Sequence, residues 1–289
     1  MTDRTKGTKD HMTKDHMTDQ HTGDHMGDHT DDHASHDTDH HASHRTRPVI
    51  TAHERGITTL TLDSPANRNA LSARLVAALG DALTACGADP SVRAVVLTHT
   101  GNTFSSGADL KEPASPYAFV ALMRQIVELP KPVVARVSGH VRAGGLGLLG
   151  ACDIAIADRT SDFAFTEVRI GVAPAVISLP LLPRVQPRAA ARYCLTGERF
   201  DAGRAAEAGL ITEAAEDADA ALAPVLDGLR RASPQGLAES KKLLTVEVLE
   251  AFDRYAEDLV RRSASLFVTA EAREGITAFM ERRDAAWVR

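Results

Sequence analysis

Residues 1–46 contain no Val, Ile, Leu, Phe, Trp or Tyr, and this confines any folded core to the rest of the chain. The segment is a degenerate repeat of Asp-His pairs and holds ten of the 13 histidines. With so little apolar surface it cannot offset its ordering entropy, so we expect a disordered tail. Its imidazoles could chelate a transition metal, but a solvated tail without a specific ligand is favoured, because low-complexity His/Asp tracts are a compositional signal only.

Charge and cysteine usage narrow the classes of function. Ten Asp against five Lys and Arg give the tail −5 of the chain's formal −6, so the remainder is nearly neutral. A nucleic-acid or anionic-membrane partner would need a basic stripe, which this remainder lacks. No signal-peptide pattern or membrane-spanning apolar run is present, so we expect a cytoplasmic protein. The dispersed Cys86, Cys152 and Cys194 lie in apolar contexts and predict buried thiols, with neither a disulfide framework nor a zinc site.

Strand and helix patterns alternate after the tail. Apolar, β-branched runs predict buried strands at residues 93–99 and 132–138, and the alternating pattern at 57–62 predicts another strand. Helical patterns lie between them, one from the N-cap Ser72 to Gly87 and another at 117–129. Strands separated by helices predict parallel pairing with crossover connections, and therefore an α/β fold.

From the N-cap Asp201 onward the pattern becomes mainly helical. Helices with broad apolar faces need a partner surface, so we expect them to pack on the core or on another subunit. The sequence therefore divides into a disordered His/Asp-rich tail (1–46), an α/β core (47–200) and a C-terminal helical region (201–289).

The stretch GGLGLLGACD has the G-x-G-x-x-G spacing of a dinucleotide-binding loop at Gly145, Gly147 and Gly150. In that fold the first glycine follows its strand almost directly, whereas here SGHVRAG intervenes after the strand. The Leu-rich run is instead typical of a buried helix. A nicotinamide dehydrogenase remains an alternative, which tight NADH binding would support.

We interpret Ala143-Gly144-Gly145 as a helix N-terminus with bare backbone N–H groups, which favour an anion. A second loop of this kind, residues 102–112, follows the strand at 93–99, and a helix could begin near Ala108. Two such turns after parallel strands can converge at one edge of a sheet. The pattern predicts an oxyanion hole.

Four ordered motifs resemble the enoyl-CoA hydratase/isomerase (crotonase) family: FSSGADLKE, KPVVARVSGHVRAGGLGLLGACDIAIA, FAFTEVRIGVAP and LTGERFDAGRAAEAGLI. The resemblance covers essentially all of residues 49–289. It implies an α/β fold, a crotonase-like spiral of β-β-α turns with a C-terminal helical trimerisation region, assembled as a homotrimer or a dimer of trimers. It also implies an acyl-CoA thioester as substrate and partner, with coenzyme A as part of the substrate, no separate cofactor and no metal.

The resemblance further implies the site residues. The thioester carbonyl would accept hydrogen bonds from the backbone N–H groups of Ala108 and Gly144, and Glu167 would be the catalytic acid/base. Acyl-CoA contacts are implied for Arg68 and Ala70, in the loop DSPANRNALS, and for Ser106, Asp109, Leu110 and Lys111. Lys111 is expected to meet a phosphate, and Asp109 to cap or pair beside the hole.

One departure affects the reaction. Hydratases of the family generally use two glutamates, and the position of the first is Gly147 here. We interpret the protein as a hydratase that adds water to a 2-enoyl-CoA with Glu167 alone. An enoyl-CoA isomerase, which needs only one carboxylate, and a noncatalytic acyl-CoA-binding or RNA-binding member remain alternatives.

The stretches AGGLGLLGACDIAIA and TEVRIGVAPAVIS are similar to those of the bacterial branch of the family that includes 3-methylglutaconyl-CoA hydratases. Arg142 could therefore receive a second acyl carboxylate, although it could equally face solvent or pair with a neighbour. His140, between the strand and Gly144, is interpreted as a packed or hydrogen-bonded residue rather than a catalyst.

Overall fold

The computed structural model describes residues 47–289, so the predicted tail lies outside the described residues. A six-stranded sheet runs in the order β1 (Val49–Glu54), β2 (Ile57–Leu62), β3 (Ala94–His99), β5 (Val133–Val137), β7 (Ile154–Asp158) and β10 (Glu213–Ala215). A four-stranded sheet runs in the order β4 (Thr103–Ser105), β6 (His140–Arg142), β8 (Asp162–Ala164) and β9 (Phe200–Asp201). The pairs β1–β2 and β8–β9 are antiparallel, and the other neighbours are parallel.

The chain alternates between the two sheets as it advances. Strand β3 is followed by β4 and then by helix α2 (Pro116–Glu128), and β5 is followed by β6 and then by α3 (Gly144–Ala151). Strands β7 and β8 lead to the short helix η2 (Glu167–Ile170), α4 (Ser178–Leu181) and α5 (Pro187–Thr196). This repetition is the predicted spiral of β-β-α turns, so the sequence expectation for the α/β fold is confirmed.

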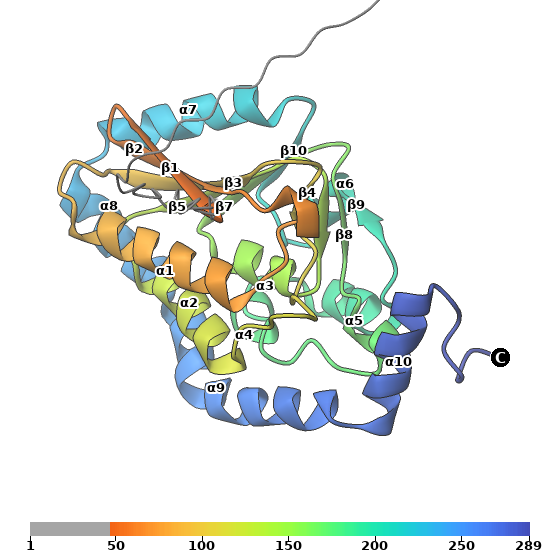
Figure 1. The fold of residues 1–289 in the computed structure, drawn as a ribbon. Helices are drawn as coiled ribbons and strands as arrows, with labels where there is room; N and C mark the ends of the chain where they lie inside the picture. The colour runs from red at the N-terminus through yellow and green to blue at the C-terminus, as the bar shows by residue number, and fades with distance from the viewer. Residues whose placement is uncertain (1–46) are drawn as a thin grey trace, which may run out of the picture. The chain divides into compact units, whose positions relative to one another are not determined.

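Both faces of the six-stranded sheet are covered (Figure 1). On one face, apolar side chains of β3, β5 and β7 pack against α7 (Ala218–Arg231). On the other face, the larger core is shared with α1 (Ala73–Ala88), α2 and the entirely apolar α3. Because each central strand is buried on both sides, its sequence is a continuous β-branched run, as the sequence indicated.

The remaining helices complete the C-terminal part. They are α6 (Ala202–Glu207), α8 (Pro234–Leu244), α9 (Val246–Phe267) and α10 (Ala270–Glu281), and η1 (Pro65–Asn67) lies earlier in the chain. The predicted N-caps are present, since the Ser72 side chain accepts from the Leu75 N–H and that of Asp201 from the Arg204 N–H. The region after Asp201 also contributes a strand, β10, to the main sheet.

One local prediction was wrong. No helix begins near Ala108; the chain runs irregularly until α2 begins at Pro116. The reason is local, because the Asp109 carboxylate accepts the N–H groups of Lys111 (2.8 Å) and Glu112 (3.1 Å) in a tight turn. Such side-chain bonds compete with helical backbone bonds.

A buried ion pair anchors α8 to the sheet. Lys241 is 5% exposed, and its Nζ lies 2.8 Å from Asp153 Oδ2. The ammonium also donates to the Ile126 and Lys131 carbonyls, while the carboxylate accepts the Val133 N–H. The pair thus joins α8, the end of α2 and two strand beginnings.

Three further observations concern the cysteines, metal ligands and membrane spans. Cys86 and Cys152 are buried and Cys194 is half-buried, all three as free thiols. Between residues 47 and 289, no cluster of His, Cys, Asp and Glu side chains could hold a metal ion. Over the same range, every helix is too short or too polar to span a membrane.

Candidate active site

Three neighbouring parallel strands bring the predicted site residues together. Strands β4, β6 and β8 lie side by side, with Ser105 opposite Val141 and Arg142 opposite Ala164. Their carboxyl ends therefore meet at one edge of the small sheet, where α/β folds commonly place binding residues. The chain continues from these ends into Ala108, Gly144 and Glu167, respectively.

The two predicted amide turns converge. A Cβ added to Gly144 would lie 3.7 Å from the Ala108 nitrogen, and one added to Gly107 would lie 3.4 Å from the Gly144 nitrogen. Within residues 47–289, neither the Ala108 N–H nor the Gly144 N–H donates a hydrogen bond. Ala108 is exposed and Gly144 is half-buried. A carbonyl oxygen that develops negative charge here could accept both donors.

Backbone conformations with positive φ shape these turns. Gly107 has φ +94°, and Ala143, which caps α3, has φ 45° and ψ −119° although it has a Cβ. The Ala143 N–H donates to the Ala164 carbonyl at 3.1 Å, which fastens the turn to β8. Strain of this kind persists only where surrounding contacts enforce it, and it is concentrated at functional sites. The sequence carries no signal for the positive φ of Ala143.

Asn69 is a structural residue of the site that the sequence reasoning missed. It is fully buried, and its side-chain amide donates to the carbonyls of Thr100 (3.1 Å) and Thr103 (2.8 Å). Its oxygen accepts the Ser64 N–H at 2.7 Å. Asn69 therefore fastens the loop before α1 to the β3–β4 connection, which leads into the Ala108 turn.

The residues implied to contact coenzyme A gather around this loop. Arg68 is exposed and its carbonyl accepts the Ser106 N–H at 3.0 Å, while Ala70 is buried. Asp109 is bonded to Asn67, as well as to the two amides of its turn. Leu110 and Lys111 are exposed beside it. The structure thus brings the predicted contact residues together, and the Asp109 carboxylate holds a turn beside Ala108 by accepting hydrogen bonds.

Glu167 begins η2 and is only 8% exposed. Its Oε2 has no hydrogen-bond partner within the part of the chain that the structure describes. Burial raises the pKa of this carboxyl from an ordinary 4.5 to about 7, against a smaller opposing effect of its own backbone N–H. A carboxylate with such a pKa can both accept and release a proton near neutral pH.

The glycines of α3 serve close packing. A Cβ on Gly147 would lie 2.6 Å from Ile177 Cγ2 and 2.9 Å from Met123 Sδ. A Cβ on Gly145 would meet Ser105, and one on Gly150 would meet Leu181. The dinucleotide interpretation is therefore not supported by the setting of these glycines. The Ile177 side chain, which is 3% exposed, fills the space beside Gly147.

Arg142 forms an ion pair with Asp162. Its guanidinium donates to both Asp162 carboxylate oxygens at 2.8 and 2.9 Å and to the Asp162 and Val141 carbonyls. The sequence left three possibilities for Arg142: a carboxylate of the acyl group, solvent or a neighbouring residue. The structure shows that it pairs with a neighbour. His140 bonds to the same carboxylate, as expected for a hydrogen-bonded histidine. The cluster ties β6 to β8.

An apolar pocket of about 530 Å³ lies beside the Glu167 segment. The pocket is lined by Phe165, Pro174, Ile177, Ser178, Leu181, Leu182, Val185, Pro187, Ala190, Ala191, Cys194 and Leu195. The pKa of the Cys194 thiol is raised to about 11, mainly by burial and then by the negative charge of Glu167, so the two groups are near each other. Ile177, which fills the space beside Gly147, is thus also one of the residues that line this pocket.

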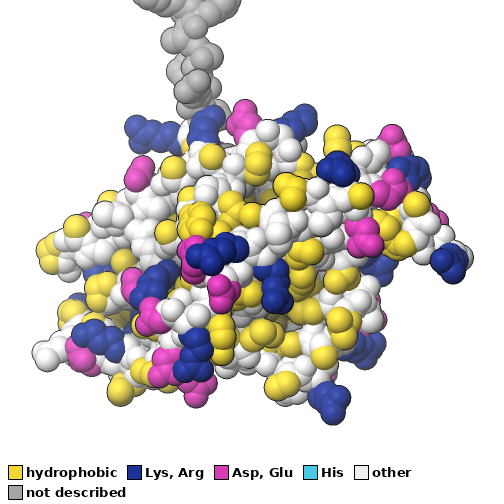
Figure 2. Space-filling view, turned by 90° about the horizontal axis from the view of Figure 1, so that it is seen from below, with side chains coloured by type: hydrophobic (Ala, Val, Ile, Leu, Met, Phe, Trp, Pro, Cys, Tyr) yellow, Lys and Arg dark blue, Asp and Glu magenta, His cyan; other side chains and the backbone are white. Residues whose placement is uncertain are grey.

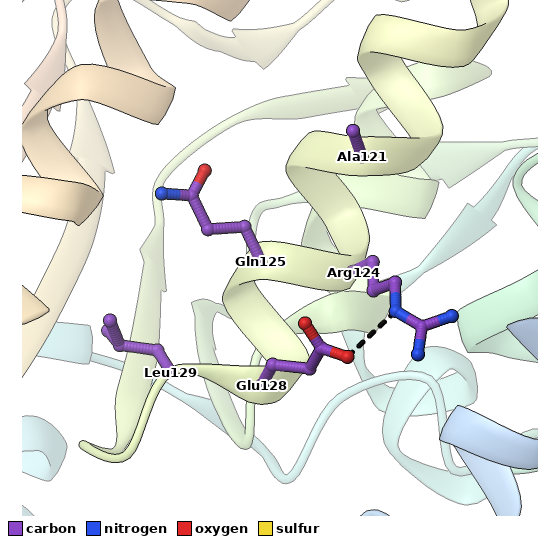
Figure 3. Close-up of a pocket in the computed structure, with 5 residues that line it drawn as sticks. All are labelled: Ala121, Arg124, Gln125, Glu128 and Leu129. Atoms are coloured by element: carbon purple, nitrogen blue, oxygen red, sulfur yellow. Dashed lines mark hydrogen bonds and ion pairs between the residues drawn. The ribbon is translucent and has the colours of Figure 1, made fainter.

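A second hollow lies on the outer surface of α2 and is lined by Ala121, Arg124, Gln125, Glu128 and Leu129 (Figure 3). The Arg124 guanidinium pairs with Glu128 at 2.7 Å and with Asp253 at 2.6 Å. Gln125 bonds to Gly80 and Thr84 of α1. Because its polar groups are already engaged, we assign no ligand to this hollow.

The structure is an α/β protein with two sheets, in which two converging backbone amides and a buried carboxylate follow neighbouring parallel strands of the smaller sheet. The model of the enoyl-CoA hydratase/isomerase family matches residues 52–289. The chain belongs to this family.

Known proteins of the family are similar over most of the chain. The structure of an enoyl-CoA hydratase from Mycobacterium avium is 55% identical, with a TM-score of 0.79 over 84% of this chain and 100% of that one. A protein of Bacillus subtilis named as a probable enoyl-CoA hydratase is 31% identical, covering 80% of this chain and 95% of the relative. The mitochondrial enoyl-CoA hydratase of Pongo abelii is 30% identical, covering 82% and 86%.

Substitution of Gly144 by Ala is expected to lower kcat/KM about 100-fold, in line with the loss of one oxyanion donor. The added methyl would stand in front of the Ala108 N–H, and its closest clash, 2.8 Å, is with the movable Leu71 Cδ1. The fold should therefore survive. Steady-state kinetics with circular dichroism tests this, and unchanged kcat/KM in a folded variant would contradict it.

Proposed function

We propose that the protein is an enoyl-CoA hydratase that adds water to a 2-enoyl-CoA with Glu167 as its acid/base. The observation that carries this is a buried carboxylate with a raised pKa that follows β8, while two converging amides follow the neighbouring strands β4 and β6. The shared family and the names of its relatives support the same reaction. Coenzyme A would enter as part of the substrate, along the loops that hold Arg68, Ala70 and Ser106 to Lys111.

The geometry supports a one-carboxylate mechanism. The thioester oxygen would accept the Ala108 and Gly144 N–H groups, which stabilise the enolate charge. The Glu167 carboxylate would take a proton from water as the oxygen bonds to the β-carbon, and would then return that proton to the α-carbon. Since one group handles both steps, water adds to one face of the double bond.

The packing of Ile177 against Gly147 supports this mechanism with a single base. No carboxylate fits at Gly147 without displacing Ile177 and Met123. The same feature keeps an isomerase as the second candidate, because moving a double bond requires proton transfer by only one group. Since Arg142 is paired with Asp162, we propose an acyl group without a second carboxylate.

Turnover of 2-butenoyl-CoA, a 3-enoyl-CoA and 3-methylglutaconyl-CoA, with products identified by mass, tests the proposal. A hydrated product from 2-butenoyl-CoA supports the hydratase. Migration of the double bond alone would move the assignment to the isomerase. Retained coenzyme A binding without turnover would favour a binding protein.

The pH dependence of kcat/KM should follow Glu167. Because the reaction begins with the basic form, kcat/KM is expected to rise as the pH passes through about 7, the pKa of the buried carboxyl. The measurement is kcat/KM from pH 5 to 9 in buffers of constant ionic strength. A profile that is flat over this range would contradict the assignment.

We also propose that the protein assembles as a trimer or a pair of trimers and acts in the cytoplasm. Large apolar side chains are exposed near the C-terminus, among them Val268, Phe279, Met280 and Val288. Hydrophobic side chains also form patches between charged ones on the face seen from below (Figure 2). Light scattering at several concentrations would measure the assembly.

A further inference from the structure

Arg169 bonds the short helix that carries Glu167 to the end of α5. Helix η2 has four residues, which is too short to fix its own orientation. The Arg169 guanidinium donates to the Gly197 carbonyl at 3.1 Å and to the Thr196 carbonyl at 3.2 Å. These bonds satisfy carbonyls at the end of α5 and fix one side of η2.

On the other side, η2 meets α10 backbone to backbone. A Cβ on Gly275 would lie 2.5 Å from the carbonyl carbon of Ile170 and 2.6 Å from its Cα. A Cβ on Gly171, whose φ is +75°, would lie 2.7 Å from the carbonyl of Glu271. Backbone atoms cannot rotate away as the end of a side chain can. The contact therefore requires glycine in both partners.

The buried face of α10 consists of small residues, which allow this close contact between backbones. Its buried residues are Ala272, Gly275 and Ala278, all small, while Phe279 and Met280 are exposed. Small residues on one helix face let the neighbouring backbone come close, and the resulting contact is rigid because protein interiors are tightly packed. Helix α10 consequently packs directly against η2, the helix that begins with the buried Glu167.

We propose that Gly275 is a positioning residue for Glu167, because it lets α10 seat directly against η2 and so fixes the place and the burial of the carboxylate. The inference depends on the proposed function for the catalytic role of Glu167. An alanine at position 275 would push α10 outward by about 1 Å, a displacement that can cost roughly 100-fold in rate at an active site. It would also admit water beside the carboxyl, which lowers a pKa that burial has raised.

Gly275→Ala and Gly228→Ala form a matched pair. Gly228 is also a helical glycine, but an added Cβ there meets nothing within 4 Å. The readouts are the pKa of Glu167 from ¹³C NMR titration of the unliganded protein, and kcat and KM with the enoyl-CoA that the protein hydrates. For Gly275→Ala we expect the pKa to fall by about one unit or more, and kcat by at least about tenfold, with KM changed by less than about threefold. Gly228→Ala should match the parent.

A folded Gly275→Ala protein with the parent's pKa and kcat would overturn the proposal. A lowered pKa with unchanged kcat would support the positioning of Glu167 and overturn its catalytic role instead. If Gly275→Ala does not fold, Ala272→Ser places a smaller wedge in the same buried face, and a pKa that stays at the parent's value would overturn the proposal.

Discussion

Substitution of Glu167 by Gln is expected to abolish most activity and at the same time stabilise the protein at alkaline pH. The loss of the acid/base should lower kcat by about 100-fold to 10,000-fold. The gain in stability follows from the raised pKa, about 7 in the folded state against an ordinary 4.5. Such a carboxyl contributes stability that is fully present below pH 4.5 and is lost as the pH rises through 7. Gln carries no charge and avoids this loss.

The stability difference can be measured by urea unfolding of both proteins at pH 5 and pH 8.5. We expect the variant to gain about 1 to 3 kcal/mol relative to the parent between these pH values. Glu213→Gln, at an exposed residue of β10, is the control and should change neither activity nor pH dependence. Parental activity in Glu167→Gln would remove the catalytic assignment, and parallel stability curves would show that the carboxyl is not desolvated.

The second large effect is expected at Lys241. Lys241→Met should lower the free energy of unfolding by about 3 to 5 kcal/mol, because it leaves the Asp153 carboxylate buried and unpaired. Burial lowers the pKa of Lys241 and raises the pKa of Asp153, in each case against the attraction between them. Desolvation therefore outweighs pairing for both groups, and either one alone is costly. Urea unfolding at pH 7 measures the effect.

The neighbouring lysine provides the control. Lys242 pairs with Glu239 on the exposed side of α8, with a side chain that is 68% exposed, so Lys242→Met should change stability by less than about 1 kcal/mol. The double variant Lys241→Met/Asp153→Asn should recover at least half of the loss, since Asn is neutral and can still accept the Val133 N–H. Equal stability of Lys241→Met and the parent would show that the pair contributes nothing.

Several features of the fold and site were predictable because their causes are local. The β-branched run at 93–99 and the Ser72 side chain determine a strand and a helix start through neighbouring atoms only. The order of strands and loops also placed the Ala108 and Gly144 turns at one sheet edge. The expected helix near Ala108 failed for an equally local reason, the turn held by Asp109.

The sequence by itself determined the α/β class, the amide turns and the identity of the acid/base candidate. The tertiary structure alone decided what surrounds them. Ile177 fills the space beside Gly147, Asp162 forms an ion pair with Arg142, and the backbone of Ile170 contacts Gly275. These contacts join residues 20 to 105 positions apart, and they depend on distances that local propensity does not encode. The raised pKa of Glu167 has the same origin, because burial is a property of the packed chain and not of the residue.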